Sequence, residues 1–322
     1  MRKYITKGAY IAALSVFSLL ATLPGIAQVS LRKALDFDAD NKADFTVFRP
    51  SNSVWYINKS GGGFTATQFG NGSTDFMTPG DYDGDGKGDI SVWRDTDGAW
   101  YRLNSSNGTF VGYSFGVTGD EPVARDYDGD GKTDIAVVRR SNGLLFWYIS
   151  RSSDGGFTAA QWGVSTDYTA PGDYDGDNKF DLTVQRPGAT PTSQATFYAL
   201  RSSDGGLMQV PWGFSNDLVI PGDYDGDGKT DVAVVREGAT PAAQLVWYIL
   251  RSSDGQPQVN FFGTTGTDLN VQADYDGDGK TDVAVWRDSV GSFYYLKSSD
   301  GSFNAAQWGS ANDYPVASYD TH

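Results

Sequence analysis

Aspartates recur along the chain in a fixed, short pattern. Residues Asp81 to Asp89 read Asp-Tyr-Asp-Gly-Asp-Gly-Lys-Gly-Asp, which places carboxylates at positions 1, 3, 5 and 9 of a nine-residue segment. Alternate side chains of such a segment converge on one point if the backbone coils around it, and Gly84 and Gly86 permit that coiling. With the carbonyl oxygen of Lys87 added, the pattern predicts an all-oxygen shell of the kind that Ca²⁺ prefers.

The pattern begins six times, at intervals of 45, 45, 47, 50 and 51 residues. We therefore expect about six Ca²⁺ ions, one in each repeat. The predicted carboxylate ligands are Asp36, Asp38, Asp40 and Asp44; Asp81, Asp83, Asp85 and Asp89; Asp126, Asp128, Asp130 and Asp134; Asp173, Asp175, Asp177 and Asp181; Asp223, Asp225, Asp227 and Asp231; and Asp274, Asp276, Asp278 and Asp282. The predicted carbonyl ligands are those of Lys42, Lys87, Lys132, Lys179, Lys229 and Lys280.

Two loops differ from the others where most have glycine. The first has Ala39 and Asn41, and the fourth has Asn178. Asparagine tolerates the left-handed backbone region, so both loops are still expected to bind a cation. An EF-hand is excluded, because no glutamate stands at position 12 and no helices flank the loops.

The charge of the chain favours bound cations over plain acidic turns. The six loops hold 24 of the 40 acidic residues, and the net charge is −15. Removing residues 1–27, which carry Arg2, Lys3, Lys7 and no acid, takes the charge to −18, and six Ca²⁺ would bring it to −6. So many like charges in nine-residue loops repel one another unless a cation neutralises them.

Each repeat predicts four short strands. In the fourth, Leu182–Val184, Phe197–Leu200, Met208–Trp212 and Leu218–Ile220 read as strands, and Arg201–Gly205 reads as a hairpin turn. Four strands in about 47 residues match one blade of a β-propeller. An open solenoid is the weaker alternative. The sequence thus predicts an all-β fold, a single β-propeller over residues 28–322, with repeats starting near 36, 81, 126, 173, 223 and 274.

The third predicted strand of each repeat ends at an aromatic residue that is followed by glycine. The pairs are Phe69-Gly70, Phe115-Gly116, Trp162-Gly163, Trp212-Gly213, Phe262-Gly263 and Trp308-Gly309. Together with the acidic loops they resemble FG-GAP/VCBS repeats, the family of the integrin α-chain propeller and many secreted bacterial proteins. The resemblance implies a calcium-binding propeller. Integrin propellers have seven blades, whereas this chain has material for six, so we expect six four-stranded blades, with seven blades including an incomplete one as the alternative.

The N-terminus reads as a Sec-type signal peptide. Basic residues precede an apolar stretch from Ala9 to Ala21, and small residues lead to an expected cleavage after Ala27. An uncleaved membrane anchor is the alternative, although the stretch is short for a span. A lipoprotein is excluded because the chain has no cysteine. We expect a secreted, extracellular protein without a membrane span in its mature form.

A strand count bears on how the ring closes. The chain holds seven copies of the first strand but six of each other strand, which leaves one spare. Residues 314–320 are the expected closing strand, because they repeat the Pro-Val-Ala pattern of residues 122–124, whereas Val29–Leu35 matches poorly. A displaced terminal strand can pair with another subunit, so strand donation is a further hypothesis.

The acidic loops and the Ser-Ser-Asp-Gly hairpins are expected on one face of the ring, because both connection types fall on the same side of a four-stranded meander. Loops between the second and third strands vary most in length and lie on the other face. Segments 187–195 and 237–245 are therefore candidates for recognition, with neutral drift as the alternative.

Two further residue series recur. An arginine follows each acidic loop (Arg49, Arg94, Arg139, Arg186, Arg236 and Arg287), and an aspartate precedes five of them (Asp75, Asp120, Asp167, Asp217 and Asp268). We interpret them as structural Arg–Asp pairs between blades, while an arginine ring that binds an anionic sugar is the alternative. Trp-Tyr pairs such as Trp147-Tyr148 are expected in core and inter-blade packing, with sugar stacking as the alternative.

Catalysis finds little support in the composition. The chain has no cysteine, one histidine (His322) and two glutamates (Glu121 and Glu237), so nucleophilic mechanisms lack their usual partners. Its negative charge argues against nucleic-acid binding. We predict an adhesive module that binds a glycan or an extracellular protein, not an enzyme. A self-associating structural protein, forming a fibre or surface layer, is the alternative, and a carbohydrate-active enzyme is less favoured.

Overall fold

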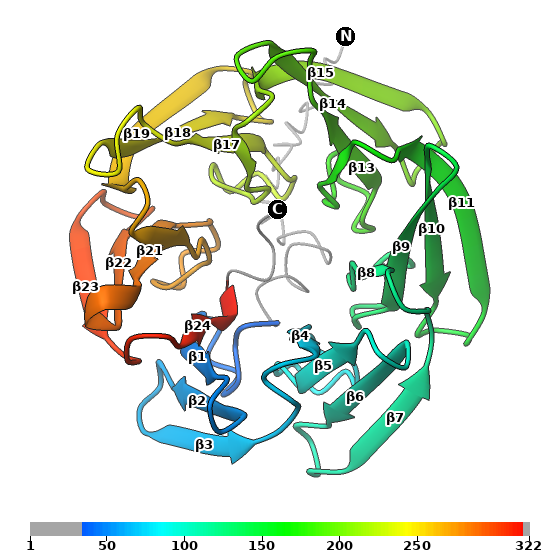
Figure 1. Ribbon diagram of the computed structural model, residues 1–322, viewed down its shortest axis with the longest axis vertical. Coiled ribbons are helices and arrows are strands. Elements are labelled where there is room, and N and C mark those ends of the chain that lie inside the picture. Colours follow the sequence, from blue (N-terminus) through cyan, green and yellow to red (C-terminus); the bar gives the residue numbers. More distant parts are fainter. Residues whose placement is uncertain (1–33, 318–322) are drawn as a thin grey trace, which may run out of the picture.

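The computed structural model describes residues 34–317, which form a ring of six β-sheets around a central axis. Figure 1 shows the sheets following one another around the ring in chain order. Residues 34–317 contain no α-helix; η1 (Asp288–Val290) is a single 3-10 turn. The prediction of an all-β propeller with six four-stranded blades is confirmed, and the seven-blade alternative is wrong. The expected signal peptide lies outside the described residues.

Each blade has four antiparallel strands, which follow one another from the axis outward. Blade 1 contains β24 (Tyr314–Pro315), β1 (Phe45–Arg49), β2 (Val54–Asn58) and β3 (Phe64–Gln68). Blade 2 contains β4 (Asp75–Met77), β5 (Ile90–Arg94), β6 (Ala99–Leu103) and β7 (Phe110–Ser114). Blade 3 contains β8 (Glu121–Pro122), β9 (Ile135–Ser141), β10 (Leu144–Ser150) and β11 (Phe157–Val164).

The remaining blades repeat this order. Blade 4 contains β12 (Tyr168–Thr169), β13 (Leu182–Arg186), β14 (Gln194–Leu200) and β15 (Leu207–Phe214). Blade 5 contains β16 (Leu218–Val219), β17 (Val232–Arg236), β18 (Gln244–Leu250) and β19 (Pro257–Thr264). Blade 6 contains β20 (Asp268–Asn270), β21 (Val283–Arg287), β22 (Ser292–Leu296) and β23 (Phe303–Gln307).

The hydrophobic core lies between blades. Along β10, Leu145, Trp147 and Ile149 are buried, whereas Tyr148 faces the other side of the sheet and is half-buried, as alternation in a strand requires. Trp147 belongs to a cluster that includes Val184 of blade 4, so each sheet face packs on its neighbour. The tryptophans of the Trp-Tyr pairs are thus core residues, as predicted.

The aromatic residues before glycine also join neighbouring blades. Phe69 contacts Phe110 of blade 2, with ring centroids 6.2 Å apart. The indole nitrogen of Trp162 donates to the carbonyl of Tyr198 in blade 4 at 3.2 Å. The indole of Trp308 in blade 6 makes the corresponding bond to Tyr56 of blade 1 at 3.0 Å. The Phe-Gly and Trp-Gly pairs therefore form the outer seams of the ring.

Arginine and aspartate pair inside each blade, not between blades as predicted. Asp75 in β4 lies directly opposite Arg94 in β5, because the innermost strand runs antiparallel to the second. The N···O distances are 2.6 to 2.8 Å for Arg49–Asp313, Arg94–Asp75, Arg139–Asp120, Arg186–Asp167, Arg236–Asp217 and Arg287–Asp268.

Each of these arginines also lies over a tyrosine of the third strand. The guanidinium carbon is 4.6 to 5.2 Å from the ring centroid of Tyr56, Tyr101, Tyr148, Tyr198, Tyr248 or Tyr294. The aspartate partners are buried. Because every arginine is held by an aspartate and a tyrosine ring, the series is a structural element of the blade rather than a free ring of cations.

The C-terminal part of the chain closes the ring. β24 pairs antiparallel with β1, Tyr314 opposite Phe48 and Pro315 opposite Val47, and it stands where β4 and its counterparts stand in the other blades (Figure 1). Arg49 and Asp313 form the ion pair of this blade across the closure. Residues 318–320 of the expected closing strand lie outside the described part of the chain, as does most of Val29–Leu35.

Replacement of Gln185 is predicted to change the free energy of unfolding. It is fully buried, and neither atom of its amide finds a hydrogen-bond partner among residues 34–317. Val138 and Val235 occupy the same register in blades 3 and 5. Since a buried unpaired amide costs about 1–3 kcal/mol, Gln185→Val should raise the free energy of unfolding by that amount in urea titrations. The reverse change, Val235→Gln, should lower it. A fall in stability for Gln185→Val would contradict this interpretation.

A second prediction concerns ring closure. Asp313→Asn and the matched Asp75→Asn each remove a charge-assisted pair, which we expect to lower the free energy of unfolding by about 2 kcal/mol. Of these two aspartates, only Asp313 joins the C-terminal part of the described chain to blade 1. Amide hydrogen exchange in β1 should therefore accelerate in Asp313→Asn and remain slow in Asp75→Asn. Equal exchange of β1 in both variants would show that the closure does not depend on this pair.

Candidate metal sites

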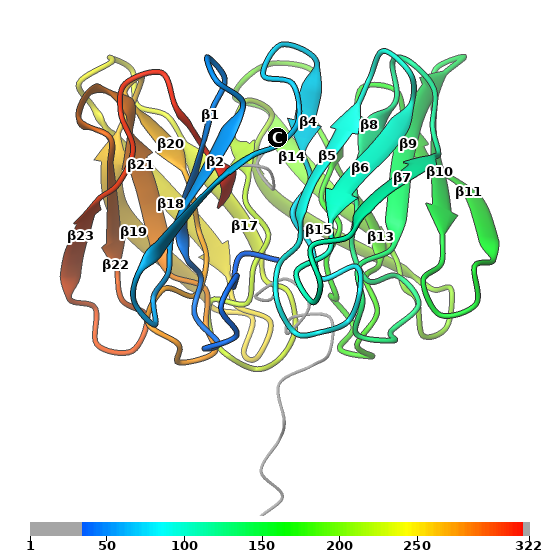
Figure 2. The ribbon, with the colours of Figure 1, turned by 90° about the horizontal axis from the view of Figure 1, so that it is seen from below.

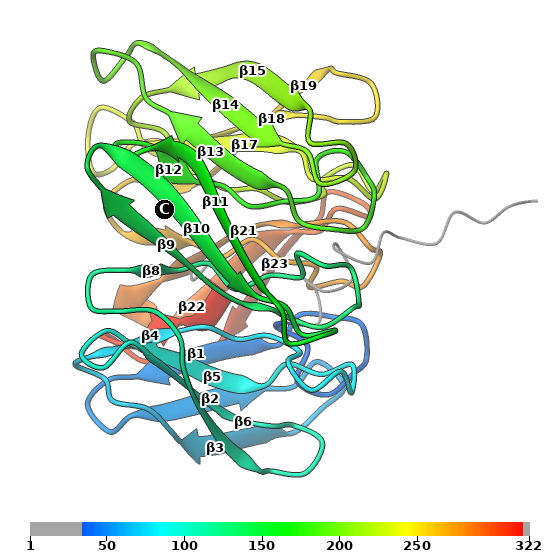
Figure 3. The same cartoon turned by 90° about the vertical axis from the view of Figure 1, so that its right-hand side faces the viewer.

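The six acidic loops lie on one face of the ring. Five of them join the innermost strand of a blade to its second strand, and the first precedes β1, the second strand of blade 1. All six lie along the lower rim in Figure 2 and the right-hand rim in Figure 3. The hairpins between the third and fourth strands reach the same face, since serines of these hairpins, such as Ser105, bond to the loop aspartates. The prediction that loops and hairpins share a face is confirmed.

Each loop coils around its first aspartate. In blade 2, one carboxylate oxygen of Asp81 accepts a hydrogen bond from the Gly84 amide at 2.7 Å, and the other accepts one from the Gly86 amide at 3.0 Å. Both glycines have positive φ, +82° and +88°. The first loop makes the same coil with Ala39 and Asn41, each at φ +66°. Alanine in this region is strained, whereas asparagine tolerates it.

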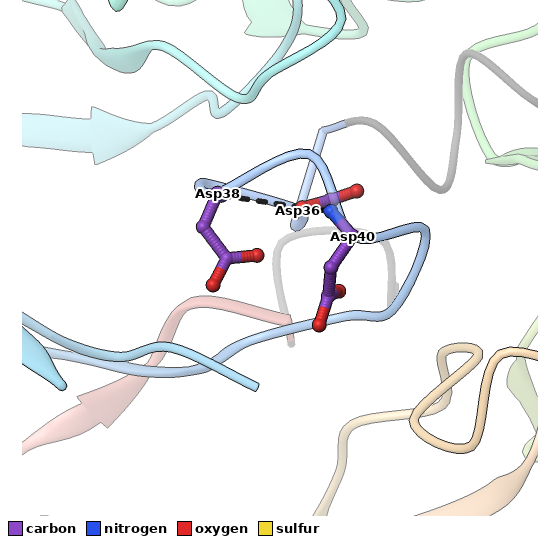
Figure 4. Close-up of side chains that lie close together, drawn as sticks. All are labelled: Asp36, Asp38 and Asp40. Atoms are coloured by element: carbon purple, nitrogen blue, oxygen red, sulfur yellow. Dashed lines mark hydrogen bonds between the residues drawn. The ribbon is translucent and has the colours of Figure 1, made fainter. Parts of the chain in front are cut away.

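The coil brings carboxylates together. In each of five loops, three aspartates offer oxygens within 4.8 Å of one another: Asp36, Asp38 and Asp40; Asp81, Asp83 and Asp85; Asp126, Asp128 and Asp134; Asp173, Asp175 and Asp181; and Asp223, Asp225 and Asp231. Figure 4 shows Asp38 and Asp40 pointing to the same side of the first loop, with the Asp38 amide bonded to Asp36. Three of the four predicted carboxylates thus converge, and the position-7 carbonyl ligands stay a prediction.

One carboxylate oxygen is left without a protein donor. Oδ1 of Asp38 is buried and has no hydrogen-bond partner among residues 34–317. Oδ2 of the same residue accepts from the Gly61 amide at 3.1 Å. A buried, unpaired carboxylate oxygen in a cluster of acids fits a cation better than a plain turn, because burial without a partner is costly.

Serines of the hairpins also bond to the loop aspartates, although the sequence predicts them only as turn residues. In blade 2, the hydroxyls of Ser105 and Ser106 donate to Asp85 at 2.9 Å and Asp83 at 2.6 Å. The Ser105 amide donates to Asp89 at 2.6 Å. Equivalent bonds occur in the other blades. In the sequence, only the recurrence of the Ser-Ser-Asp-Gly string could have indicated that these serines contact the acidic loops.

The six loops are also bonded to one another in a closed cycle. The amide at position 8 of each loop donates to the carbonyl oxygen of position 1 in the preceding loop. These bonds, 2.6 to 2.9 Å long, are Gly88–Asp36, Thr133–Asp81, Phe180–Asp126, Thr230–Asp173, Thr281–Asp223 and Ala43–Asp274. The last of them joins blade 1 to blade 6. A change in one loop is therefore transmitted to the joint between two blades.

Burial controls the acidity of the loops. The aspartates at positions 1 and 9 are at most 3% exposed, and desolvation by burial is the largest cause of the raised pKa of each of those named next. The pKa is raised to about 7 for Asp134, Asp173, Asp231 and Asp282, and to about 6 for Asp44, Asp89, Asp126, Asp181 and Asp223. Backbone hydrogen bonds lower these values in part, while neighbouring loop aspartates raise several further. Proton or cation binding would relieve this unfavourable charge.

Comparison with known families agrees with this geometry. A family model described as FG-GAP-like repeat matches residues 36–92 and 126–184. The chain contains FG-GAP-like repeats. Each matched segment begins at an acidic loop, includes the hairpin that bonds to it and runs on into the next blade. No curated protein matches the sequence. Residues 34–317 include no helix long and apolar enough to cross a membrane.

Two solved structures are similar to the chain at low sequence identity. A triple arginine-to-alanine mutant of AofleA from Arthrobotrys oligospora is 10% identical, with a TM-score of 0.52 over 90% of both chains. A catalytically inactive virginiamycin B lyase from Staphylococcus aureus is 11% identical, with a TM-score of 0.45 over 86% of both chains. At this identity the similarity of the first shows the fold alone.

The loops on the opposite face are anchored within their own blades. The segment between β13 and β14 bonds through the Gly188 amide to the Ser215 hydroxyl at 2.7 Å. The segment between β17 and β18 makes the same bond from Gly238 to Thr265 at 2.8 Å. Glu237 borders a hollow of about 790 Å³ that also reaches Arg49 and Tyr314. These candidate recognition loops lie apart from the acidic clusters.

The raised pKa values predict an unusual pH dependence. A carboxyl whose pKa is about 7 in the folded protein and 3.8 ordinarily gives stability that is present at low pH and lost as pH rises through 7. In metal-free buffer the melting temperature should therefore be higher at pH 5.5 than at pH 7.5.

Asp134→Asn is the control for this pH effect. It removes one titrating group and should reduce the pH dependence, while general charge repulsion stays nearly unchanged. The exposed Asp154, Asp254 and Asp300 have lowered pKa values and act in the opposite sense. A metal-free melting temperature that rises with pH between 5.5 and 7.5 would contradict the assignment.

Proposed function

We propose that the chain is an extracellular, non-catalytic binding module whose acidic loops hold Ca²⁺ and thereby make the ring rigid. The observation that carries this proposal is the closed cycle of loop-to-loop hydrogen bonds through the carbonyls of the position-1 aspartates. A cation in any loop would order the joint between two blades. A stiff ring is what a binding surface made of separate loops needs, because preorganisation lowers the entropic cost of binding.

The donor set supports calcium among biological cations. The converging groups are carboxylates from positions 1, 3 and 5 or 1, 3 and 9 of a loop, with serine hydroxyls beside them and no nitrogen or sulfur ligand. Hard oxygen ligands in an adaptable shell suit Ca²⁺, whereas Mg²⁺ requires near-ideal octahedral geometry and keeps its waters. The buried, unpaired Oδ1 of Asp38 is the kind of atom that such an ion would accept as a ligand.

A binding role is favoured over catalysis by how the polar side chains are used. Among residues 34–317 there is no histidine or cysteine. The recurring aspartates are committed to loop coiling or to pairs with arginine. Glu121 already contacts Arg140 and Thr169 at 2.9 and 2.6 Å. The extracellular location rests on the FG-GAP-like repeats and on the signal-peptide pattern of residues 1–27.

Self-association through terminal strands is less well supported by the geometry. Tyr314–Pro315 occupies the innermost position of blade 1 in its own ring. The indole of Trp308 and the carboxylate of Asp313 hold the same end of the chain to blade 1. We therefore favour an internal closing strand over strand donation to a second copy.

Removal of calcium is the direct test. Each site that is saturated at one hundred times its dissociation constant adds about 2.7 kcal/mol, so millimolar Ca²⁺ should raise the free energy of unfolding by several kcal/mol in total. Calorimetric titration should give about six ions per chain. An unchanged melting temperature on adding chelator would refute the metal sites.

A double variant localises one of those ions. Asp83→Asn with Asp85→Asn removes two converging carboxylates of blade 2 and spares Asp89, which accepts bonds from the Ser105 and Tyr82 amides. We expect the calorimetric stoichiometry to fall by one ion. The control is Asp154→Asn, which alters an exposed hairpin aspartate paired with Arg151 and should leave the stoichiometry unchanged.

A further inference from the structure

A small basic groove lies between blades 2 and 3, near the face that carries the acidic loops. Its volume is about 240 Å³, and its polar lining includes Arg102, Tyr113, Lys132, Ser150, Arg151 and Ser152. No aspartate or glutamate is among the residues that line it, although the chain has a net charge of −15. The groove is therefore a positively lined region in a protein whose net charge is negative.

The repeats themselves show which lining residues are unusual. Arg102 stands where the other blades have apolar or aromatic residues, namely Ile57, Ile149, Ala199, Ile249 and Tyr295. Ser150 stands where the others have Asn58, Leu103, Leu200, Leu250 and Leu296. Tyr113 stands where they have Thr67, Ala160, Val210, Asn260 and Ala306. Three departures, from β6, β7 and β10, thus meet in one groove.

Two of the three cations have donors to spare. Nε of Arg102 donates to Asn104 at 2.9 Å, but its terminal nitrogens bond to no residue between 34 and 317. The stem of Lys132 packs over Gly84. Its backbone amide donates to Asp130, and its ammonium has no ion pair or hydrogen bond among residues 34–317. Arg151, in contrast, is satisfied by Asp154 and Thr158. Because these donors of Arg102 and Lys132 are cationic and have no protein acceptor, an anionic ligand would suit them.

The other lining groups suit a sugar ring. Tyr113 lines the groove and is 44% exposed, although it also stacks on Phe115 with ring centroids 6.2 Å apart. The exposed part of its ring can contact the C–H groups of a sugar. Its hydroxyl lies 3.2 Å from the hydroxyl of Ser150, and Ser150 replaces a bulky leucine in most other blades. The volume is below the ~300 Å³ at which pockets for drug-sized ligands begin. One monosaccharide unit is the matching size.

We propose that this groove binds a hexuronic acid residue of an extracellular acidic polysaccharide. Arg102 and Lys132 bind its carboxylate, since a guanidinium offers paired donors to a planar anion. Ser150 would bond to a ring hydroxyl and Tyr113 forms one wall, whereas the Ser152 hydroxyl already donates to Asp130 at 2.9 Å. The proposal rests on the binding role proposed above and does not require calcium in the loops.

The equivalent groove between blades 5 and 6 is an internal control. It has Lys280 and Lys297 in the positions of Lys132 and Arg151, but Ile249 replaces Arg102. Asn260 and Leu296 stand in place of Tyr113 and Ser150, and two aspartates, Asp225 and Asp254, line it. It therefore lacks the three features that define the proposed site.

The test is calorimetric titration with methyl β-D-glucuronide and methyl β-D-glucoside at constant Ca²⁺. We expect the glucuronide to bind at least tenfold more tightly than the neutral glucoside. Arg102→Ile restores the residue of blades 1, 3 and 5, so it should fold normally, and it should weaken glucuronide binding at least tenfold. Lys132→Met should also weaken binding, whereas the matched Lys280→Met should change it less than twofold.

Several results would overturn the proposal. These are equal affinity for glucoside and glucuronide, unchanged affinity in Arg102→Ile, or acetate binding as tight as that of the glucuronide. A glucuronide signal that survives Arg102→Ile but disappears with chelator would place the sugar on a loop cation instead. Calcium-dependent melting of Arg102→Ile, measured alongside, separates failure of this site from failure of the metal sites.

Discussion

The burial of carboxylates at the joints between blades is the constraint on which the rest of this structure depends. The aspartates at positions 1 and 9 of each loop are almost fully buried, and the position-1 residue also bonds to the next loop through its backbone. Carboxylate charge costs little free energy at the surface, but here it is buried at the contacts between neighbouring blades. The groups proposed to bind a cation are therefore the same groups that hold the blades in register.

A second recurring group of residues, toward the opposite face of the ring, compensates the charge of another set of buried aspartates. Each arginine after a loop is held by a buried aspartate of its own blade and covered by a tyrosine. The arrangement satisfies a buried carboxylate, since an aspartate with no exposed surface needs a charged partner. The six arginine side chains stay 26 to 40% exposed, but each already donates to its aspartate and lies over a tyrosine ring.

Near-identical repeats allow each blade to serve as a reference for the others. Gln185 stands out because Val138 and Val235 occupy the same place, and nothing in the described structure satisfies its amide. Arg102 stands out in the same way, but its departure coincides with those of Tyr113 and Ser150 in one groove. A single substitution relative to the other blades, such as Gln185, is interpreted as a local loss of stability. Three such substitutions that line one groove support the proposed binding site.

The sequence by itself determined the repeat number, the all-β blades and the face on which loops and hairpins meet. These follow from period and alternation, which are local properties: Trp147 and Tyr148 must point to opposite sides of β10 in any sheet. The acidic spacing likewise fixed which side chains converge, because Asp81 to Asp85 are neighbours along one coiled loop. Only the tertiary structure decided that Arg94 pairs with Asp75 inside its own blade, that Ser106 reaches Asp83, and that Arg102 and Lys132 share a groove. These contacts join residues 19 or more positions apart, and their partners depend on strand register and on how neighbouring blades pack, neither of which is encoded in any short segment.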